Sequence, residues 1–380
     1  MENSPPARAS LGEDRRWMQV ALAASRRAEG RSGANPPVGC AIVSVQGALV
    51  AVGHTAPGGR PHAETEAIAM AGDAARGATA YVTLEPCAHT GETGPCADAL
   101  VTAGIARVVI AIRDPDSRVN GRGIERLAEA GVDIQIGVEA EAARRVMGGF
   151  LSRVGRKRPL VTWKTATSLD GMIALGDGAK RWVTGPAMRR YVHLQRSRSD
   201  GLLSAIGTVL ADDPEFTCRT LGLEGDSPHR FILDANLRTP PDARLLASAP
   251  EVGLTIFCRE DSDPQAAVAL REAGAEVQSV AMDTAGRLAL GEVMQAIAET
   301  GCGNLMVEGG GKLGASLLRD GYVDRILWTR SAHLIGHDGI PAIGALGTTS
   351  LPEAPAFTIT SEGRFAGDSF IMLERPADIG

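Results

Sequence analysis

The stretch from Pro61 to Cys96 limits most strongly how the chain can fold, because it spreads metal-binding side chains over separate local elements. It offers the imidazole of His62, the thiols of Cys87 and Cys96, and the carboxylate of Glu64 two residues after the histidine. Three nitrogen and sulfur ligands suit a tetrahedral zinc ion whose fourth position stays open for water. A structural zinc would normally have a fourth protein ligand, so three ligands and a nearby acid favour a catalytic site.

The segments between these residues predict a helix from Glu64 to Ala75 and a strand from Thr79 to Leu84. Bound zinc lowers the pKa of a water from about 15.7 toward about 7. Glu64 could then take the water proton and pass it to a leaving amine. This arrangement is typical of nucleobase deaminases, although eight residues separate the two cysteines here instead of two. We expect both cysteines near helix starts, where the thiolate is favoured.

Length and composition predict a soluble chain of two domains. A chain of 380 residues is long for one core, and its net charge of -6 and aromatic content of 4% do not suit a nucleic-acid binder. The start of the chain lacks an apolar signal, and we expect neither a membrane span nor a membrane partner. Six scattered cysteines without a disulfide pattern indicate the cytoplasm.

The first half alternates between apolar strands and amphipathic helices. After a helix and a hairpin, helices and strands follow one another, which predicts a layered α/β domain with a mixed sheet. The expected helices cover residues 13–28, 64–75, a segment after Cys96 and 121–130, and the expected strands cover 38–45, 48–53, 79–84, 107–112 and 132–136.

Several motifs of this half closely resemble the bifunctional deaminase–reductase family of bacterial riboflavin biosynthesis. They are Asn35-Pro36-Pro37-Val38-Gly39, His62-Ala63-Glu64, the run from Gly77 to Cys87, and Gly121-Arg122-Gly123. The resemblance covers nearly the whole chain. It implies a cytidine-deaminase-like fold for residues 11–150, which would replace the ring 2-amino group of a diaminopyrimidinone ribosyl phosphate by oxygen.

The same resemblance implies roles for individual residues. His62, Cys87 and Cys96 would bind zinc, and Glu64 would move protons. The implied substrate-binding residues are Asn35, His54, Ala63, His89 and Asp114. One position departs from the family, which usually has a basic residue where this chain has Glu92. If that residue contacts the substrate phosphate in the family, Arg113 or Arg118 would have to replace it here.

The second half begins after a glycine-rich and basic stretch over 148–159, which predicts a linker. Its most informative element is a strand over 304–308 followed by a glycine loop that opens a helix. Free backbone N–H groups and the helix dipole there suit a dinucleotide phosphate. Gly309, Gly311 and Gly314 match the pattern G-x-G-x-x-G, although a tight turn without a ligand would explain them equally well.

The runs Lys164–Gly171, Gly207–Pro214 and Glu308–Gly310 resemble the reductase half of the same family. This implies a dihydrofolate-reductase-like α/β domain over 159–378 that reduces the ribosyl group to ribityl with NADPH. Lys164 would polarise the sugar carbonyl or imine. The implied cofactor-binding residues are Ala166, Trp182, Thr208, Asp212, Gly310, Gly311, Lys312, Leu313, Gly314, Ala315 and Ser316, and the implied substrate-binding residues are Lys180, Arg196, Phe216, Arg219 and Glu308. Lys180 stands where the family commonly has a serine.

The sequence therefore predicts an enzyme that acts on a small phosphorylated pyrimidine and assembles as a homo-oligomer, a dimer or a tetramer. Two alternatives stay open at this point. The first is a deaminase of bases in RNA, which shares the His-x-Glu and Pro-Cys motifs. The second is a non-catalytic protein, in which zinc only stabilises the fold and the second domain senses a dinucleotide.

Overall fold

The computed structural model describes residues 10–89, 94–116, 119–176 and 182–376. The chain divides into two compact units, residues 1–157 and 158–380. Among the described residues, no helix is both long and apolar enough to cross a bilayer.

The N-terminal unit is built on a mixed sheet of five strands in the order β2-β1-β3-β4-β5. Strands β1 and β2 form the predicted hairpin, β1 also pairs antiparallel with β3, and β3, β4 and β5 are parallel. The strands are β1 Gly39–Val43, β2 Leu49–His54, β3 Thr79–Leu84, β4 Arg107–Ile112 and β5 Asp133–Ile136. Every residue of β1 and β4 is buried, as expected for strands covered on both faces.

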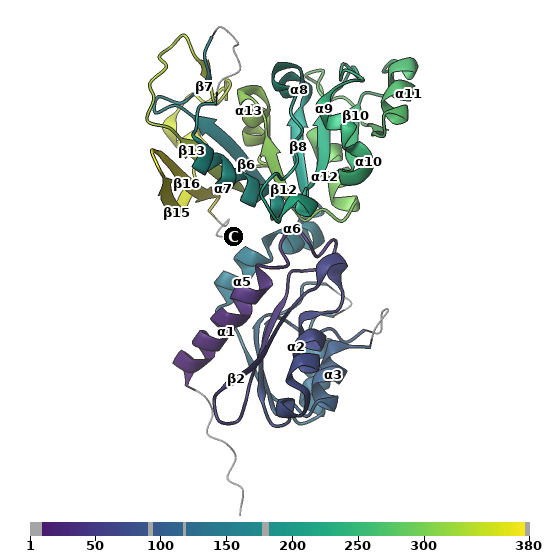
Figure 1. Cartoon of the computed structure of the whole chain (residues 1–380), viewed down its shortest axis with the longest axis vertical. Helices are drawn as coiled ribbons and strands as arrows, with labels where there is room; N and C mark the ends of the chain where they lie inside the picture. Colours follow the sequence, from purple (N-terminus) through teal and green to yellow (C-terminus); the bar gives the residue numbers. More distant parts are fainter. Residues whose placement is uncertain (1–9, 90–93, 117–118, 177–181, 377–380) are drawn as a thin grey trace, which may run out of the picture. The chain divides into compact units, whose positions relative to one another are not determined.

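Helices cover both faces of this sheet, with α1 and α5 on one side and α2 and α3 on the other (Figure 1). The helices are α1 Leu11–Ser25, α2 Ala63–Ala71, α3 Cys96–Thr102, α4 Arg122–Glu129, α5 Ala140–Val146 and α6 Gly148–Arg156, with short 3₁₀ turns at Pro57–Gly59 and Gly72–Ala75. Glycines allow the close contact, because a Cβ on Gly53 would lie 2.2 Å from the Ala63 carbonyl oxygen of α2.

A buried ion pair fixes α1 to the sheet. The guanidinium of Arg107 on β4 donates to both carboxylate oxygens of Asp14 at 2.8 and 2.9 Å, and the Tyr81 hydroxyl of β3 donates to Asp14 at 3.0 Å. Breaking such a buried pair by removing one partner typically costs about 3–5 kcal/mol. The helix start is also capped, since Ser10 and Glu13 bond to each other's backbone N–H groups.

The predicted linker over 148–159 is wrong for most of its length. Residues Gly148–Arg156 form helix α6, and Phe150 and Leu151 pack against the core of the N-terminal unit. Two adjacent glycines weaken a helix on their own, but burial of the two apolar side chains that follow offsets this cost.

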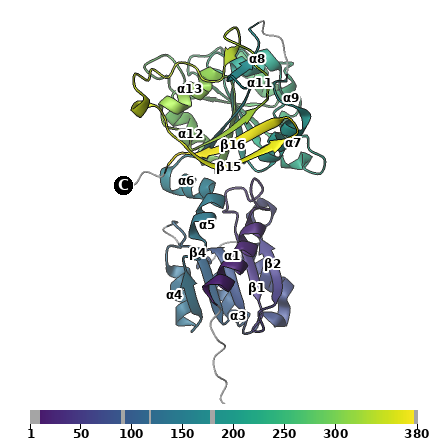
Figure 2. The same ribbon diagram turned by 90° about the vertical axis from the view of Figure 1, so that its left-hand side faces the viewer.

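The C-terminal unit contains a nine-stranded sheet in the order β11-β10-β9-β8-β12-β6-β13-β16-β15. Its first seven strands are parallel and the last two, β16 and β15, are antiparallel at one edge (Figure 2). The strands are β6 Leu160–Thr167, β8 Gly201–Ala205, β9 His229–Leu233, β10 Leu254–Cys258, β11 Glu276–Ser279, β12 Asn304–Glu308, β13 Arg325–Arg330, β15 Thr358–Phe365 and β16 Asp368–Glu374, and β7 Met172–Ala174 pairs separately with β14 Ile340–Pro341.

Successive strand residues point into two cores on opposite faces of this sheet. Leu203 and Phe231 belong to one core, with α12 Leu290–Glu299 and α13 Gly311–Arg319. Their neighbours Leu202 and Ile232 belong to the other core, with helices α8 Ile206–Asp212, α9 Arg244–Ala247, α10 Ala249–Val252 and α11 Pro264–Glu272. Helix α7 Pro186–Ser197 packs against β15 and β16, since the Tyr191 ring lies 5.0 Å from that of Phe365 and 4.7 Å from that of Phe370. Both units are α/β, as the alternating pattern predicts.

Candidate functional site

The three predicted metal ligands come together in the N-terminal unit. One ligand atom each of His62, Cys87 and Cys96 lies within 4.8 Å of the other two. His62 is the N-cap residue of α2, and Cys96 is the first residue of α3. Cys87 follows β3 in irregular backbone, so the expectation that it lies at a helix start is wrong. The proline before it ends the strand, because proline cannot donate to a sheet ladder.

The spacing of these atoms fits zinc. His62 Nδ1 lies 3.2 Å from Cys96 Sγ and 3.7 Å from Cys87 Sγ. A tetrahedral zinc with ordinary bond lengths places a nitrogen and a sulfur ligand about 3.5 Å apart. The hydrogen bond from Cys96 lowers the pKa of Cys87 to about 4, and the same contact raises the pKa of Cys96. A thiolate is the form that binds metal.

Glu64 lies in the first turn of α2 and is only 4% exposed. Burial, together with the negative charge of Cys87, raises the pKa of its carboxyl group to about 7. At neutral pH this group can therefore both accept and release a proton. That is the property that a general acid and base needs.

The other predicted residues of this unit surround the same end of the sheet. His54 ends β2, where its Nδ1 lies 3.3 Å from the carboxylate of Glu66. The Asn35 side chain lies against Gly59, since a Cβ there would be 2.0 Å from its Nδ2. The remaining positions are Ala63 in the first turn of α2, His89 just beyond Cys87, and Asp114 after β4. His89 Nδ1 is buried and has no hydrogen-bond partner within the described residues. Glu92 and Arg118 lie outside them.

The sequence analysis did not predict the role of Glu85, the residue after β3. Its buried carboxylate accepts hydrogen bonds from the backbone N–H groups of Asp114, Gly121, Gly123 and Ile124, at 3.1 to 3.3 Å. It therefore joins the end of β3, two residues before Cys87, to the Asp114 loop and the start of α4. Its position just before Pro86-Cys87 indicates a place near the site. Its hydrogen-bond partners, however, lie 29 to 39 residues away in the chain, so local sequence does not reveal them.

In the C-terminal unit, a cluster of charged side chains forms where β6, β12 and α7 meet. The guanidinium of Arg196 donates to both oxygens of Glu308, at 2.5 and 2.9 Å, and both side chains are 11% exposed. Burial raises the pKa of Glu308, but Arg196 and then Lys164 outweigh it and bring that pKa to about 2. Glu308 and Lys164 are register partners on neighbouring strands, and burial lowers the pKa of Lys164.

The predicted glycine loop has the expected geometry. Strand β12 ends at Glu308, Gly310 is the N-cap residue, and Gly311–Ser316 lie in α13. Packing already requires two of the glycines: a Cβ on Gly311 would lie 2.8 Å from the Pro341 carbonyl oxygen, and one on Gly314 would lie 2.4 Å from the Trp163 ring. Gly310 has open space around it. Its side of the helix start is therefore free to accept an anion.

The remaining predicted reductase residues are spread over several elements. Trp182, just before α7, is 76% exposed, and the Arg189 guanidinium lies 4.7 Å above its ring. Lys180 lies outside the described residues. The other positions are Ala166 on β6, Thr208 and Asp212 on α8, and Phe216 and Arg219 in the segment after α8.

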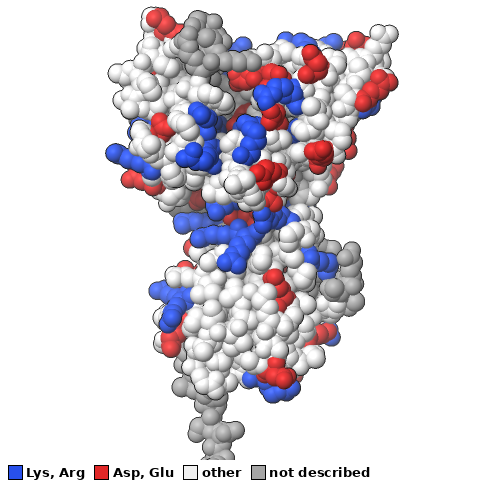
Figure 3. Space-filling model, viewed as in Figure 1, with Lys and Arg blue, Asp and Glu red and all other residues white. Residues whose placement is uncertain are grey.

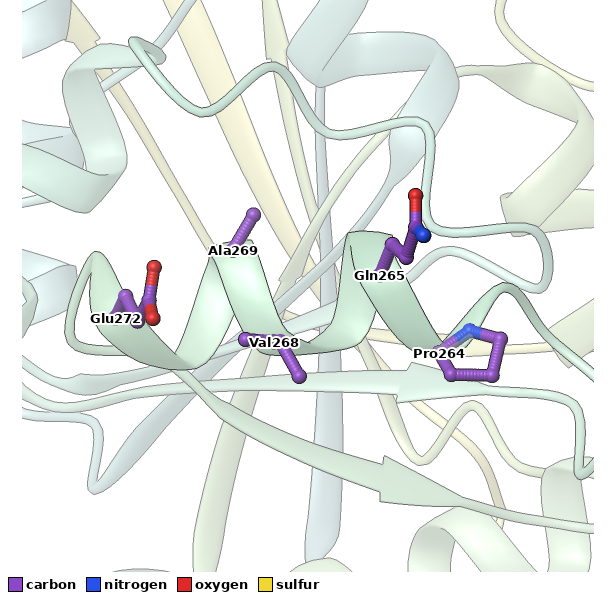
Figure 4. A pocket seen from close by; sticks show the side chains of 5 residues that line it. All are labelled: Pro264, Gln265, Val268, Ala269 and Glu272. Atoms are coloured by element: carbon purple, nitrogen blue, oxygen red, sulfur yellow. The ribbon is translucent and has the colours of Figure 1, made fainter.

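A surface hollow elsewhere contains none of these residues. It is lined by Pro264, Gln265, Val268, Ala269 and Glu272, which all lie on α11 (Figure 4). Binding sites usually gather polar groups from several elements around an apolar pocket. A hollow on one helix does not do this, and we assign it no role.

Both units match families of known proteins. Residues 11–112 match the cytidine and deoxycytidylate deaminase zinc-binding region, and residues 159–362 match the RibD C-terminal domain. The chain is 36% identical to the riboflavin biosynthesis protein RibD of Aquifex aeolicus, over 90% of this chain and 92% of that protein. The chain belongs to the RibD family of riboflavin biosynthesis proteins.

Other RibD proteins match equally broadly. The Escherichia coli RibD protein is 36% identical over 91% of this chain and 95% of its own length. A solved Acinetobacter baumannii RibD superposes with a TM-score of 0.87 at 31% identity, covering 97% of this chain and all of that one. A Thermotoga maritima diaminohydroxyphosphoribosylaminopyrimidine deaminase/5-amino-6-(5-phosphoribosylamino)uracil reductase gives 0.83 at 29% identity, covering 96% and 99%. The chain is accordingly a bifunctional enzyme, a zinc-dependent deaminase joined to an NADPH-dependent reductase.

Proposed function

We propose that the N-terminal unit deaminates a diaminopyrimidinone that carries a ribosyl 5'-phosphate, and that the C-terminal unit then reduces its ribosyl chain to ribityl. The observation that carries this proposal is the convergence of His62, Cys87 and Cys96 beside the buried Glu64. The names of the similar RibD proteins support the choice of substrate.

In the deaminase unit, we assign His62, Cys87 and Cys96 as the zinc ligands. Zinc held by these residues would supply Lewis acidity that lowers the pKa of water. The buried Glu64 carboxyl group would accept a proton from the attacking water and deliver it to the leaving amine. Asn35, His54, Ala63, His89 and Asp114 line the pyrimidine pocket. The buried Nδ1 of His89 has no hydrogen-bond partner among the described residues and leaves a polar atom for the substrate.

In the reductase unit, the cofactor carries the hydride, and the protein positions it against the sugar carbon. The open N-terminus of α13 at Gly310 receives a phosphate group of NADPH. Lys164, the register partner of Glu308 on the neighbouring strand, polarises the carbonyl or imine that accepts the hydride. We assign Ala166, Trp182, Thr208, Asp212 and residues 310–316 to the cofactor side, and Lys180, Arg196, Phe216, Arg219 and Glu308 to the substrate side.

Arg196 and Arg219 differ in what they can offer a substrate phosphate. All three guanidinium nitrogens of Arg196 donate hydrogen bonds, two of them to Glu308 and one to the Thr217 carbonyl oxygen. The Arg219 side chain is 46% exposed and bonds to the Glu215 carboxylate at 3.0 Å. We therefore assign the phosphate contact to Arg219, and the support of Glu308 to Arg196.

For the whole chain, we propose a cytoplasmic homo-oligomer with small-molecule partners only. All six cysteines are free, which suits a reducing compartment. Strand β15 is the outermost of its sheet and residues 358–362 are exposed, so a second copy could pair with this edge. On the face in Figure 3, acidic and basic side chains are interspersed over the C-terminal unit. This distribution agrees with the net charge of -6 and argues against a nucleic-acid partner.

Because α6 packs on the N-terminal core, we place the end of the deaminase domain at residue 157.

A stepwise assay tests this function. Zinc content is measured first, then ammonia release from the pyrimidine substrate, then NADPH absorbance loss on the deaminated product. We expect Glu64→Ala to keep its zinc and its reductase activity but to lose ammonia release. Ammonia release that survives Glu64→Ala would refute the role of Glu64, and protein without zinc would refute the site.

A further inference from the structure

The backbone from residue 213 to 219 takes a conformation that needs support from its surroundings. Asp213 and Phe216 have φ angles of 43° and 56°, in the left-handed region that residues with a Cβ rarely adopt. Such conformations persist only where neighbouring contacts hold them, and they gather at functional sites. The Phe216 side chain is buried, with the Arg196 guanidinium 6.0 Å from its ring.

Helix α7 provides this support through one face. His193 and Arg196 are three residues apart, and so lie on the same side of the helix. The Arg196 Nη1 donates to the Thr217 carbonyl oxygen at 3.0 Å, and the Cys218 thiol donates to the His193 carbonyl oxygen at 3.4 Å. The backbone N–H of Arg219 donates to the His193 imidazole at Nδ1, at 3.2 Å.

This last bond determines the state of the imidazole. A backbone N–H can only donate, so Nδ1 must carry no proton and His193 must be neutral. The surroundings favour that state, because burial, followed by the charges of Arg196 and Arg219, lowers the pKa of His193 to about 4. His193 is therefore a hydrogen-bond acceptor throughout the neutral range. No other role in the reaction is assigned to it above.

The bond to His193 Nδ1 also holds the backbone of Arg219, from which its side chain extends. The Arg219 guanidinium forms an ion pair with Glu215, which also pairs with Arg244. The His193 bond holds the Arg219 backbone against α7, beside the Arg196–Glu308 pair. Without it, the Glu215 contact could draw the guanidinium away from the charged cluster.

We propose that His193 is a positioning residue of the reductase, which acts by holding Arg219 where it meets the substrate phosphate. The inference rests on the assignment of Arg219 to that phosphate. It predicts that a change at His193 affects binding of the phosphorylated substrate and not the hydride step.

The test uses the full chain with His193→Leu, which removes the acceptor, and His193→Asn, whose side-chain oxygen can occupy the place of Nδ1. We expect His193→Leu to raise the reductase KM for the phosphorylated substrate about tenfold, the effect of losing roughly one well-placed polar contact. We expect kcat and the Kd for NADPH to change less than about twofold, because the cofactor side is untouched. His193→Asn should restore most of the KM, and an unchanged NADPH Kd shows that the unit is folded.

Two further measurements separate positioning from a merely structural role. The dephosphorylated substrate should show the same KM in the wild-type protein and in His193→Leu. In an Arg219→Ala background, His193→Leu should add no further loss, since its effect passes through Arg219. A KM increase that persists in that background, or with the dephosphorylated substrate, would overturn the inference.

The two proposals fail in different ways. If Arg219→Ala leaves the KM for phosphorylated substrate unchanged, the assigned phosphate contact is wrong, and this inference falls with it. If Arg219→Ala raises that KM and His193→Leu does not, only the role of His193 is wrong.

Discussion

The buried carboxylate of Glu85 offers a prediction whose magnitude follows from its contacts. Oε2 accepts from the N–H groups of Asp114 and Gly121, and Oε1 from those of Gly123 and Ile124. In Glu85→Gln one oxygen becomes an NH₂ group, which cannot accept. Whichever oxygen is replaced, one buried bond and one half-buried bond are lost.

Losing the partner of a buried N–H costs about 1–3 kcal/mol, and losing a bond that water can replace costs about 0.5–1.5 kcal/mol. We therefore expect Glu85→Gln to lower the free energy of unfolding of the N-terminal unit by about 1.5–4.5 kcal/mol. Because the lost bonds hold the Asp114 loop and α4 against the residue before Pro86-Cys87, deaminase activity should fall while reductase activity remains.

Hydrogen exchange in increasing urea, read on peptides from residues 11–157, measures this free energy for one unit alone. The control is Glu125→Gln, which removes an equal charge from the exposed first turn of the same helix. The control should cost no more than about 1 kcal/mol, through the helix dipole only. If the two variants differ by less than about 0.5 kcal/mol, the backbone bonds to Glu85 do not stabilise the unit, and the reasoning fails.

Further predictions concern the cofactor, the metal, the phosphate and pH. Gly310→Asp should weaken NADPH binding at least about tenfold, because it places an anion at the start of α13. Gly310→Ala fits the open space there and should leave NADPH binding unchanged. If the two variants have equal Kd values for NADPH, this helix start is not part of the cofactor site. Chelation of zinc should stop ammonia release, spare NADPH oxidation and allow alkylation of Cys87 and Cys96, as mass spectrometry would show. Arg113→Ala should raise the deaminase KM only for phosphorylated substrate, because Arg113 is exposed at the end of β4 and Glu92 offers no positive charge; an unchanged KM would exclude it. Since the Glu308 pKa is about 2 rather than 4.5, the stabilisation from its ionised form is complete above pH 4.5 and is lost as pH falls toward 2. Arg196→Met should remove that acid-induced loss in urea unfolding of the C-terminal unit.

Local patterns predicted the strands and the metal cluster well, because both depend on residues close in sequence. The predicted strands Thr79–Leu84, Arg107–Ile112 and Asn304–Glu308 agree with the structure to the residue. Each is a short, mostly buried apolar run bounded by residues that end a strand. Cys96 lies at the start of a helix, as predicted, since the proline before it and the apolar residues after it are close in sequence.

Errors arose where tertiary contacts outweighed local preference. The glycines of 148–149 predicted a linker, but packing of Phe150 and Leu151 makes this segment a helix. Beyond Leu317 the sequence analysis assigned no elements, and the structure adds β13, β15 and β16. Strand β15 is hard to recognise from its sequence, because it is largely exposed and shows no clear alternation.

The contacts that position these groups could not be predicted from the sequence, and the reason is the same for each of them. The Arg196–Glu308 pair joins residues 112 positions apart, and the bond from Arg219 to His193 joins residues 26 apart. Neither residue type nor spacing reveals such a bond, because it forms only when strands and helices have been placed side by side. Parallel strands end at the same edge of a sheet, so residues from distant segments gather there, and ligands bind beyond that edge. Glu85 after β3 and Glu308 at the end of β12 both lie at such edges. The Glu85 carboxylate accepts from four backbone N–H groups, so it can only support its neighbours. The Glu308 carboxylate is bound by the guanidinium of Arg196 and remains beside Lys164 in the charged cluster.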